Sequence, residues 1–414
     1  MRGALTSLYV SVETPTGSTS WTGHERGSVE YRRLLAALFC AGIATFAQLY
    51  SPQAVLPLIA AGLHTGAAAS ALMVSSSTIG LAIGVIGWST LADRIGRVKA
   101  MSLSVGIATV LGLGVPFAPT FELLLAGRFV EGLALGGVPA IAVAYLTEEI
   151  ESGHAARAAG TYVAGTTIGG LLGRLVSAPV GEVLGWRLGM FAVALLCSAA
   201  AFGFTRLAPA PRGFRPGAGA DATEGSLGHR LAVNLRSGRQ LALYLQGFAL
   251  MGGFVAMYDF LGFRLSAPPF ALPQTLVSLV FVAYLAGTWA SARAGASATR
   301  HGRAPVLLGS IGVMAVGVAI TLSANIIVVL LGLLVATAGF FGAHAIASGW
   351  TGQLATVGKA QASSLYNLAY YAGSSVIGWF GGLAFDAAGW TAVAVTILVL
   401  EVIAAVVAAI ALRD

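Results

Sequence analysis

The sequence predicts an all-α membrane protein with twelve transmembrane helices in two pseudo-symmetric six-helix halves. The first observation behind this prediction is composition: 57% of the 414 residues are hydrophobic, 9% are charged, and the mean hydropathy is +0.84. A soluble domain has no place for that much apolar surface, whereas a lipid bilayer does. The second observation is that about twelve apolar runs reach the roughly 20 residues that a spanning helix needs. The third is an internal repeat of half the chain length.

The repeat consists of two short motifs that recur at nearly the same spacing. Residues 91–99 read LADRIGRVK and residues 298–303 read ATRHGR, so that the glycines of the two copies lie 206 residues apart. The segment Glu182-Val-Leu-Gly-Trp186 is repeated 204 residues later as Asp386-Ala-Ala-Gly-Trp390. A repeat of this length in an apolar chain predicts two homologous membrane halves, which is how many secondary transporters are built.

The order of the apolar runs gives the domain organisation. We expect residues 1–33 to form a cytoplasmic tail and residues 207–240, which are rich in proline, glycine and arginine, to form a cytoplasmic linker. The expected helices of the first half, residues 34–206, lie near 34–54, 69–91, 99–118, 121–145, 156–179 and 187–206. Those of the second half, residues 241–412, lie near 241–262, 273–293, 304–323, 325–347, 361–384 and 390–412.

Basic residues set the orientation, because cytoplasmic loops are enriched in lysine and arginine. With both termini in the cytoplasm, 19 of the 23 basic residues fall in cytoplasmic segments. The exceptions are Arg128, Arg174, Arg187 and Arg264. The net charge of +7 therefore reflects topology in the inner (plasma) membrane and does not point to nucleic acid as a partner.

Several kinds of chemistry have no support in the sequence. The phosphate-binding pattern G-x-x-x-x-G-K-[ST] fails at Gly358-Lys359, because Ala360 follows the lysine. There is no H-E-x-x-H motif and no cluster of histidine and cysteine, so no metal or other cofactor is expected. Cys40 and Cys197 lie inside apolar runs, which disfavours a structural disulfide. We expect a protein that is not an enzyme and that uses an ion gradient or works passively.

The segment from Ser89 to Lys99 resembles the loop 2–3 signature of the major facilitator superfamily, with serine in place of the first glycine. The resemblance implies a fold of two six-helix halves around a central cavity, a functional monomer, and a cytoplasmic gate built by the charges of this loop. Its residues would be Asp93, Arg94, Gly96 and Arg97, with Arg300, Gly302 and Arg303 in the second copy.

The implied gate works through charge. Asp93 can lie against the positive N-terminal end of helix 11, near Lys359, and Arg97 can bridge to Asp93 or to acidic residues such as Glu148. In the second copy Thr299 replaces the aspartate, which predicts a weaker contact. The alternative is that these arginines only mark the cytoplasmic side.

Helix 4 contains Arg128-Phe-Val-Glu131-Gly132, which resembles the R-x-x-Q-G signature of proton-coupled exporters in this superfamily, with glutamate in place of the amide. An arginine in lipid is costly, so we expect Arg128 to face a cavity or a partner. Glu131 is three residues further along and lies on the same helix face. The two residues are either a proton-coupling pair or a static buried salt bridge.

Three further ionisable residues are candidates. Helix 5 is rich in glycine, like the helix 5 motif of antiporters, and also carries Arg174, which close packing does not require. Depth along the helices predicts a cluster of Arg128, Arg174 and Asp259 in the outer half, with Glu131 deeper; Asp259 could instead lie at the outer water interface. His344 is a candidate proton carrier or a structural histidine.

Matches such as Gln361-Ala-Ser-Ser364 and Gly169-Gly-Leu-Leu-Gly173 resemble YnfM-type exporters of the same superfamily. The resemblance implies proton-coupled export of a small organic molecule, such as a drug or metabolite, by alternating access. The expected partners are the substrate, protons and the lipid bilayer.

The alternative is an importer or facilitator of a small organic anion or a sugar, in which Arg128 and Arg174 bind the substrate directly. A membrane enzyme or sensor would need a nucleophile–base pair or a metal set.

Overall fold

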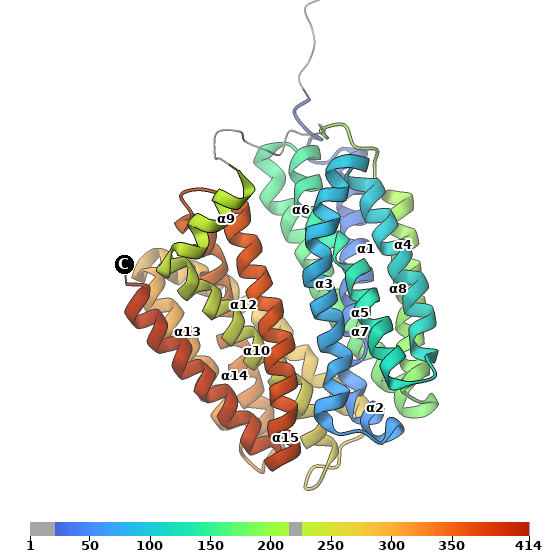
Figure 1. Ribbon diagram of the computed structural model, residues 1–414, viewed down its shortest axis with the longest axis vertical. Helices are drawn as coiled ribbons and strands as arrows, with labels where there is room; N and C mark the ends of the chain where they lie inside the picture. Colours follow the sequence, from blue (N-terminus) through green and yellow to red (C-terminus); the bar gives the residue numbers. More distant parts are fainter. Residues whose placement is uncertain (1–20, 215–225, 414) are drawn as a thin grey trace, which may run out of the picture.

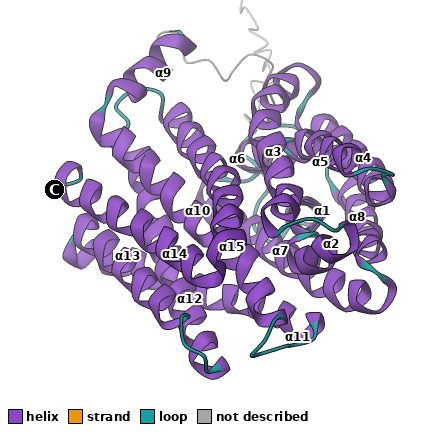
Figure 2. Ribbon diagram, turned by 60° about the horizontal axis from the view of Figure 1, so that its bottom comes forward, coloured by secondary structure: helices purple, strands orange, loops and turns teal. Residues whose placement is uncertain are grey.

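The computed structural model describes residues 21–214 and 226–413 as two bundles of long helices packed side by side (Figure 1). Residues 1–20 of the expected tail and residues 215–225 of the expected linker lie outside the described part. Figure 2 shows the same helices without any strand among the described residues, which form only an isolated bridge between His24 and Ile150.

The first bundle contains six spanning segments, some of them built from two pieces. In chain order its helices are α1 (Val29–Tyr50), η1 (Gln53–Val55), α2 (Leu56–Leu63), α3 (Ala67–Ile95), α4 (Arg97–Gly114), η2 (Val115–Phe117), α5 (Phe121–Leu135), α6 (Gly137–Glu149), η3 (Ser152–His154), α7 (Ala155–Leu184) and α8 (Trp186–Leu207).

The second bundle repeats this arrangement after a connecting helix. Its helices are α9 (Leu227–Arg236), α10 (Gly238–Ser266), α11 (Gln274–Ser278), η5 (Leu279–Ala283), α12 (Tyr284–His301), α13 (Arg303–Ile320), α14 (Ile326–Leu354) and α15 (Lys359–Ala411). In the described residues, eleven helical segments are long and apolar enough to cross a membrane. The last is 53 residues long and loses helical geometry at Ala388 and Gly389, so it supplies two spans. The predicted fold of twelve spanning helices in two halves is confirmed.

The glycines of both repeated motifs have the same unusual backbone geometry in each half. Gly96 and Gly302, which join α3 to α4 and α12 to α13, have φ values of 94° and 85°. Gly185 and Gly389, which start the last span of each half, have φ values of 90° and 64°. A side chain is strained at such positive φ values, so glycine is the residue that both turns require.

Some spans differ from the expected uninterrupted runs. The first span reaches from Val29 to Leu63 and is interrupted after Tyr50, whereas a single run over 34–54 was expected. Pro52 lies in this interruption; it has no backbone N–H and cannot continue the helical hydrogen bonding. The fourth span is interrupted at Gly136, and in the eighth span a 3₁₀ segment, η5, joins α11 to α12.

Close packing explains most of the glycines of the fifth span. A Cβ atom placed on Gly165, Gly169 or Gly173 of α7 would lie 2.3–2.6 Å from the backbone of α1. The backbones of α1 and α7 therefore touch along this row, which small residues allow. Gly160 is an exception, because nothing lies within 4 Å of such an atom there.

The two halves touch at the end of the bundle that lies away from the linker, which we call the far end. Asp386 of α15 accepts hydrogen bonds from the backbone N–H groups of Ala67 and Ala68, at 2.9 and 3.1 Å. Glu182 of α7 accepts from the backbone N–H of Thr275, at 2.8 Å. Both carboxylates belong to the second repeated motif, and each caps the first turn of a helix in the other half.

Nearer the middle of the membrane, the halves are joined by hydroxyl groups of α3 and α15. The Thr78 and Ser375 hydroxyls are 2.7 Å apart, and Ser75 donates to the Ser375 carbonyl at 3.1 Å. Within the described ranges, no side-chain hydrogen bond joins the halves nearer to the linker than Thr78 and Ser375. The structure is therefore closed at the far end.

The expected linker is partly helical and is fastened to both halves. Glu149, at the end of α6, accepts from the backbone N–H groups of Arg212 and Gly213, each at 2.7 Å. Asn234 of α9 donates to the Val357 carbonyl just before α15, at 2.9 Å. We call this side of the bundle the linker end; it lies at the top of Figure 1.

Candidate functional site

The interruption of the first span creates the binding place for Arg128. Because Pro52 lacks an N–H, the Gln48 carbonyl loses its usual helical donor four residues on. Arg128 donates to the carbonyls of Gln48 at 3.3 Å, Leu49 at 2.7 Å and Met73 at 3.1 Å. Arg128 is fully buried, and it ties the end of α1 to α3 and α5.

Glu131 lies beside Arg128, as their spacing on one helix predicts, and is also fully buried. Its Oε2 accepts from Arg128 Nη1 at 2.6 Å, and its Oε1 accepts from the Gln48 amide at 2.5 Å. Arg128, Glu131 and Gln48 therefore form a closed network between α1 and α5, which we call the helix 1 network. Neither charged member of it lines the large cavity described below.

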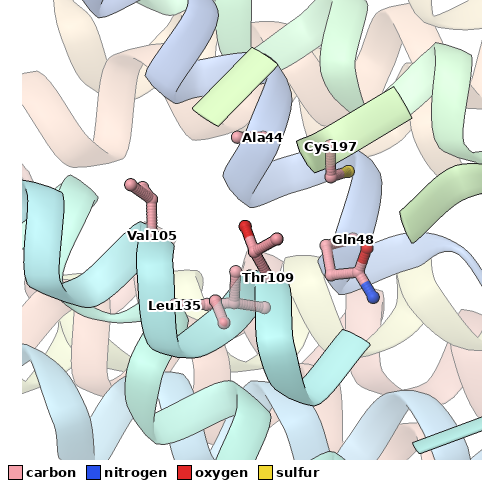
Figure 3. A pocket seen from close by; sticks show the side chains of 7 residues that line it. Ala44, Gln48, Val105, Thr109, Leu135 and Cys197 are labelled. Carbon is pink, nitrogen blue, oxygen red and sulfur yellow. The ribbon is translucent and has the colours of Figure 1, made fainter. Parts of the chain in front are cut away.

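A small hollow lies beside Gln48 of the helix 1 network (Figure 3). It has a volume of about 10 Å³ and is bordered by Gln48, Val105, Thr109, Leu135 and Cys197, with Ala44 and Ala108. Such a volume is close to the minimum for one water molecule. Gln48 Oε1, which has no hydrogen-bond partner among the described residues, belongs to a side chain of its wall.

A second polar group lies just past the interruption in the first span. Gln53 of η1 donates to Asp259 Oδ1 at 2.5 Å and accepts from Arg174 Nε at 2.7 Å. All three side chains are at most 2% exposed. Gln53 therefore joins a carboxylate of the second half to an arginine of the first half. Asp259 is buried and does not lie at a water interface.

Arg174 is held mainly by neutral groups. Its Nη1 donates to the Gly170 carbonyl at 2.6 Å and its Nη2 to the Tyr284 hydroxyl at 3.3 Å. The rings of Tyr50, Phe281 and Tyr284 lie 4.4–4.9 Å from its Cζ atom, within cation–π range. Among the described residues it forms no ion pair, in contrast to Arg128.

Arg174 lines a cavity between the halves with a volume of about 340 Å³. The walls come from α1, α7, α10, α12, α14 and α15, so both halves contribute. The aromatic side chains in the walls are Phe46, Tyr50, Phe254, Tyr284, Phe340, Phe341 and Tyr370. Such a volume, with walls that combine aromatic side chains with several polar groups, is typical of small-molecule sites.

The helix 1 network and the cavity lie on opposite faces of α1. Phe46 and Tyr50 are four residues apart and line the cavity. Gln48, midway between them, points about 200° around the helix from each, given 3.6 residues per turn. Helix α1 thus separates the buried ion pair from the cavity.

His344 is in the cavity wall, on α14. Its Nδ1 lies 3.0 Å from the Tyr366 hydroxyl, and its ring stacks on Phe340 with centroids 5.8 Å apart. Tyr370 packs against it at 4.8 Å between centroids. The structure therefore gives His344 both a packing role and access to the cavity.

At the linker end, Arg97 connects two acidic residues of its own half. It donates to Asp93 at 2.6 Å and to Glu148 at 2.8 Å. Asp93 forms no hydrogen bond or ion pair with residues 359–361, the start of α15, although that contact between the halves was expected. This conformation, closed at the far end, leaves the expected gate contact unmade. Arg94 lies on the exposed last turn of α3.

The second copy of the motif has the same geometry with less charge. Arg303 donates to Gln353, which takes the place that Glu148 has in the first half. Thr299 stands where the first copy has Asp93, and its hydroxyl donates to the Ala296 carbonyl within its own helix. Arg300 is exposed on the last turn of α12. Both carboxylates of the first copy thus have neutral counterparts.

Several residues of the site were not found from the sequence. Gln53 belongs to no recognised motif, although a position directly after Ser51-Pro52 is typical of the end of a helix. Tyr284 and Phe341 belong to apolar runs in which aromatic residues are common as packing. Near the far end, Asp386 and Glu182 were noticed only as parts of a repeat, and nothing local shows that each reaches the opposite half.

A bundle of apolar helices in two halves, with a small-molecule cavity between them and buried charges beside it, defines a membrane transporter. The sequence profile described as the Major Facilitator Superfamily matches residues 35–296. This chain belongs to the Major Facilitator Superfamily. It is a multi-pass membrane transporter and not an enzyme.

Two relatives match nearly the whole chain. The inner membrane transport protein YnfM of Escherichia coli (strain K12) is 38% identical over 383 residues, which cover 92% of this chain and 91% of that protein. The MFS-type transporter YybF of Bacillus subtilis (strain 168) is 36% identical over 368 residues, covering 89% and 90%. The crystal structure of a variant of the nucleoside transporter NupG has the same fold, with a TM-score of 0.75 at 14% identity, over 92% of this chain and 100% of that one.

Proposed function

We propose that this protein exports small organic molecules across the plasma membrane in exchange for protons, by alternating access of the cavity to the two sides. The linker end is then cytoplasmic, and the structure is the state that is closed to the outside. The observation that carries the proposal is the helix 1 network: a fully buried carboxylate whose partners also hold the end of α1, one wall of the cavity.

The coupling follows from what a proton on Glu131 would change. Protonation removes the negative charge that pairs with Arg128, whose remaining contacts are carbonyls at the end of α1 and in α3. A buried arginine without its charge partner is costly, so the contacts at the interruption would rearrange. Between Gln48 and Gln53 this segment also carries Tyr50, so a change at its start can reach Arg174 and the cavity.

Alternating access then uses the contacts at the two ends of the bundle. The carboxylates of Asp386 and Glu182 hold the far end closed in this state. When they release, the linker end can close, with Asp93 against the start of α15. The halves would rock about the cavity as two bodies.

The test uses inside-out vesicles with an acidic interior, a pH probe inside, and a panel of dyes, antibiotics and organic acids. Substrate addition should make the interior more alkaline in vesicles that contain the wild-type protein. Glu131→Gln should abolish this proton movement, because the amide cannot carry the proton while it keeps the hydrogen-bonding shape. Glu122→Gln, on the exposed first turn of the same helix, is the matched control and should behave as wild type.

A second candidate is proton-linked uptake of a small organic anion. It is supported by Arg174, a cation in the cavity wall that forms no ion pair within the described structure, while Asp259 is linked to it only through Gln53. A proton on Asp259 would favour an anion beside Arg174, which is the arrangement for symport. Uptake that rises with an inward proton gradient in right-side-out vesicles would support this candidate.

A further inference from the structure

We infer that the cavity binds small aromatic carboxylates, with the carboxylate at Arg174 and the ring among the aromatic side chains of the second half. The inference deepens the proposed function by naming the substrate class, and it rests on the cavity being the transport site. It does not depend on the direction of transport.

The charge of the cavity wall selects for anions. Among the described residues that line the cavity, Arg174 is the one arginine, and there is no lysine, aspartate or glutamate. Asp259, linked to Arg174 through Gln53, is 1% exposed and does not line the cavity. An organic cation would therefore meet a like charge in the wall and no carboxylate to balance it.

The hydrogen bonds of Arg174 leave room for a ligand. A guanidinium carries five N–H groups, and the described structure uses one on each nitrogen, toward Gln53, Gly170 and Tyr284. Two donors remain on a side chain that is 1% exposed. A buried arginine that lacks an ion pair is costly, and a carboxylate with two oxygens matches its free donors.

The shape of the rest of the cavity selects for a flat, aromatic body. Phe254 and Phe340 stack with centroids 3.9 Å apart, and Phe341 and Tyr284 stand nearly edge-on to their neighbours. Aromatic pairs prefer such offset or edge-to-face arrangements, so a ligand ring gains contacts that an aliphatic ring of equal size does not. The volume of about 340 Å³ has room for one or two rings.

The hydroxyl groups of Thr166, Thr167, Thr288 and Ser291 also line the cavity. They can accept or donate hydrogen bonds to ring substituents. A hydroxylated aromatic acid would therefore fit as well as a plain one.

The test is equilibrium binding to the purified full chain in lipid nanodiscs, with four probes of similar size: benzoate, benzamide, benzylamine and cyclohexanecarboxylate. Benzoate should bind at least about tenfold more tightly than benzamide, as charge-assisted hydrogen bonds to arginine imply. Benzylamine should not bind, and cyclohexanecarboxylate should bind several-fold more weakly than benzoate. Failure of benzoate to bind, or tighter binding of the amide or the amine, would overturn the inference.

Two variants separate the two features of the site. Arg174→Gln should remove the preference for benzoate over benzamide, while Phe341→Leu should keep that preference and remove the preference over cyclohexanecarboxylate. Arg293→Gln, an exposed arginine on α12, is the control and should bind as wild type. An unchanged preference in Arg174→Gln would also overturn the inference. If the Arg174 variant does not fold, the Phe341 variant still tests the inference. Weakening of benzoate binding and of cyclohexanecarboxylate binding by the same factor in Phe341→Leu would contradict the ring contact.

This binding test needs no gradient, so its failure differs from failure of the proposed function. Benzoate that binds through Arg174 without any proton movement in vesicles would reject proton exchange and keep the substrate class. Proton movement with other compounds, but no benzoate binding, would reject the substrate class and keep proton exchange.

Discussion

Asp386, at the end of one half, caps helix α3 of the other half by accepting from the backbone N–H of Ala67 at 2.9 Å. The N-cap position of α3 is Gly66, which has no side chain to satisfy the first N–H groups itself. In the other half of the repeat, Glu182 accepts from the backbone N–H of Thr275 at the start of α11. The same motif thus closes the far end twice.

Removing the carboxylate of Asp386 should weaken the closure of the far end. Loss of a helix cap costs about 1 kcal/mol, so Asp386→Ala should shift the ratio of far-end-closed to far-end-open molecules about fivefold toward open. Spin labels on Val183 and Leu276, which are 80% and 50% exposed on opposite halves, would report the distance change. Asp93→Ala, which changes a carboxylate at the linker end, should not open the far end.

Removal of both caps should have an additive effect. The caps of Asp386 and Glu182 act on different helix pairs and share no partner among the described residues, and independent sites add in free energy. The double variant Asp386→Ala with Glu182→Ala should therefore change the ratio of far-end-closed to far-end-open molecules by roughly the product of the two single effects. The same spin-label distances report this ratio. A double variant that opens no further than Asp386→Ala alone would show that one contact controls the closure.

Replacement of Arg128 should destabilise the fold more than replacement of an exposed arginine. A lysine keeps the positive charge but cannot reach three carbonyls and a carboxylate at once, so Arg128→Lys should lose about 1–3 kcal/mol by leaving buried acceptors unpaired. Thermal unfolding in detergent measures the difference, with Arg293→Lys as the control. Arg128→Met with Glu131→Met should be more stable than Arg128→Met alone, because no unpaired charge remains; equal or lower stability would contradict the buried ion pair.

Gln53 should matter because, among the described residues, it is the side chain that joins Asp259 to Arg174. Gln53→Leu leaves both without this partner, and an unsatisfied buried polar group costs about 1–3 kcal/mol. We expect a lower unfolding temperature and loss of benzoate binding. Gln246→Leu, a buried glutamine whose amide donates to the Ala404 carbonyl away from the cavity wall, is the control: it should lower stability but keep binding. Benzoate binding that survives Gln53→Leu would contradict the role of Gln53 in positioning Arg174.

The features of this fold that could be predicted from the sequence are those that repeat along the chain or follow helical spacing. The echo of Gly96 in Gly302 predicted two halves, because both turns need a positive φ. The i,i+3 spacing predicted that Arg128 and Glu131 meet, since side chains three residues apart on a helix are neighbours. Apolar run lengths predicted the spans, because the bilayer sets the length of a helix.

Contacts between distant segments could not be predicted in the same way. The contact of Arg128 with the Gln48 carbonyl depends on an interruption in another helix. The hydrogen bond between Gln53 and Asp259 depends on how the two halves pack against each other. The expected cluster of Arg128, Arg174 and Asp259 divides into two groups, because Gln48 and Gln53 face different partners on either side of the interruption. Depth along a helix gives the level of a residue in the membrane and not its direction.

The pH dependence of binding separates the two candidate functions. Exchange requires that proton and substrate oppose each other, so benzoate should bind more weakly at about pH 6 than at about pH 8, a range in which an aromatic carboxylate stays ionised. Symport requires the opposite sign, because a proton on Asp259 would favour the anion at Arg174. Equilibrium binding across this range, with Asp259→Asn and Glu131→Gln, would assign the change to one carboxylate.

The most direct test of the account is substrate-driven proton movement in inside-out vesicles, compared between the wild-type protein and Glu131→Gln. An aromatic carboxylate should make the acidic interior more alkaline with the wild type and leave it unchanged with Glu131→Gln, while Glu122→Gln should behave as wild type. Proton movement of equal size with Glu131→Gln would contradict the central claim that the buried carboxylate beside Arg128 carries the proton.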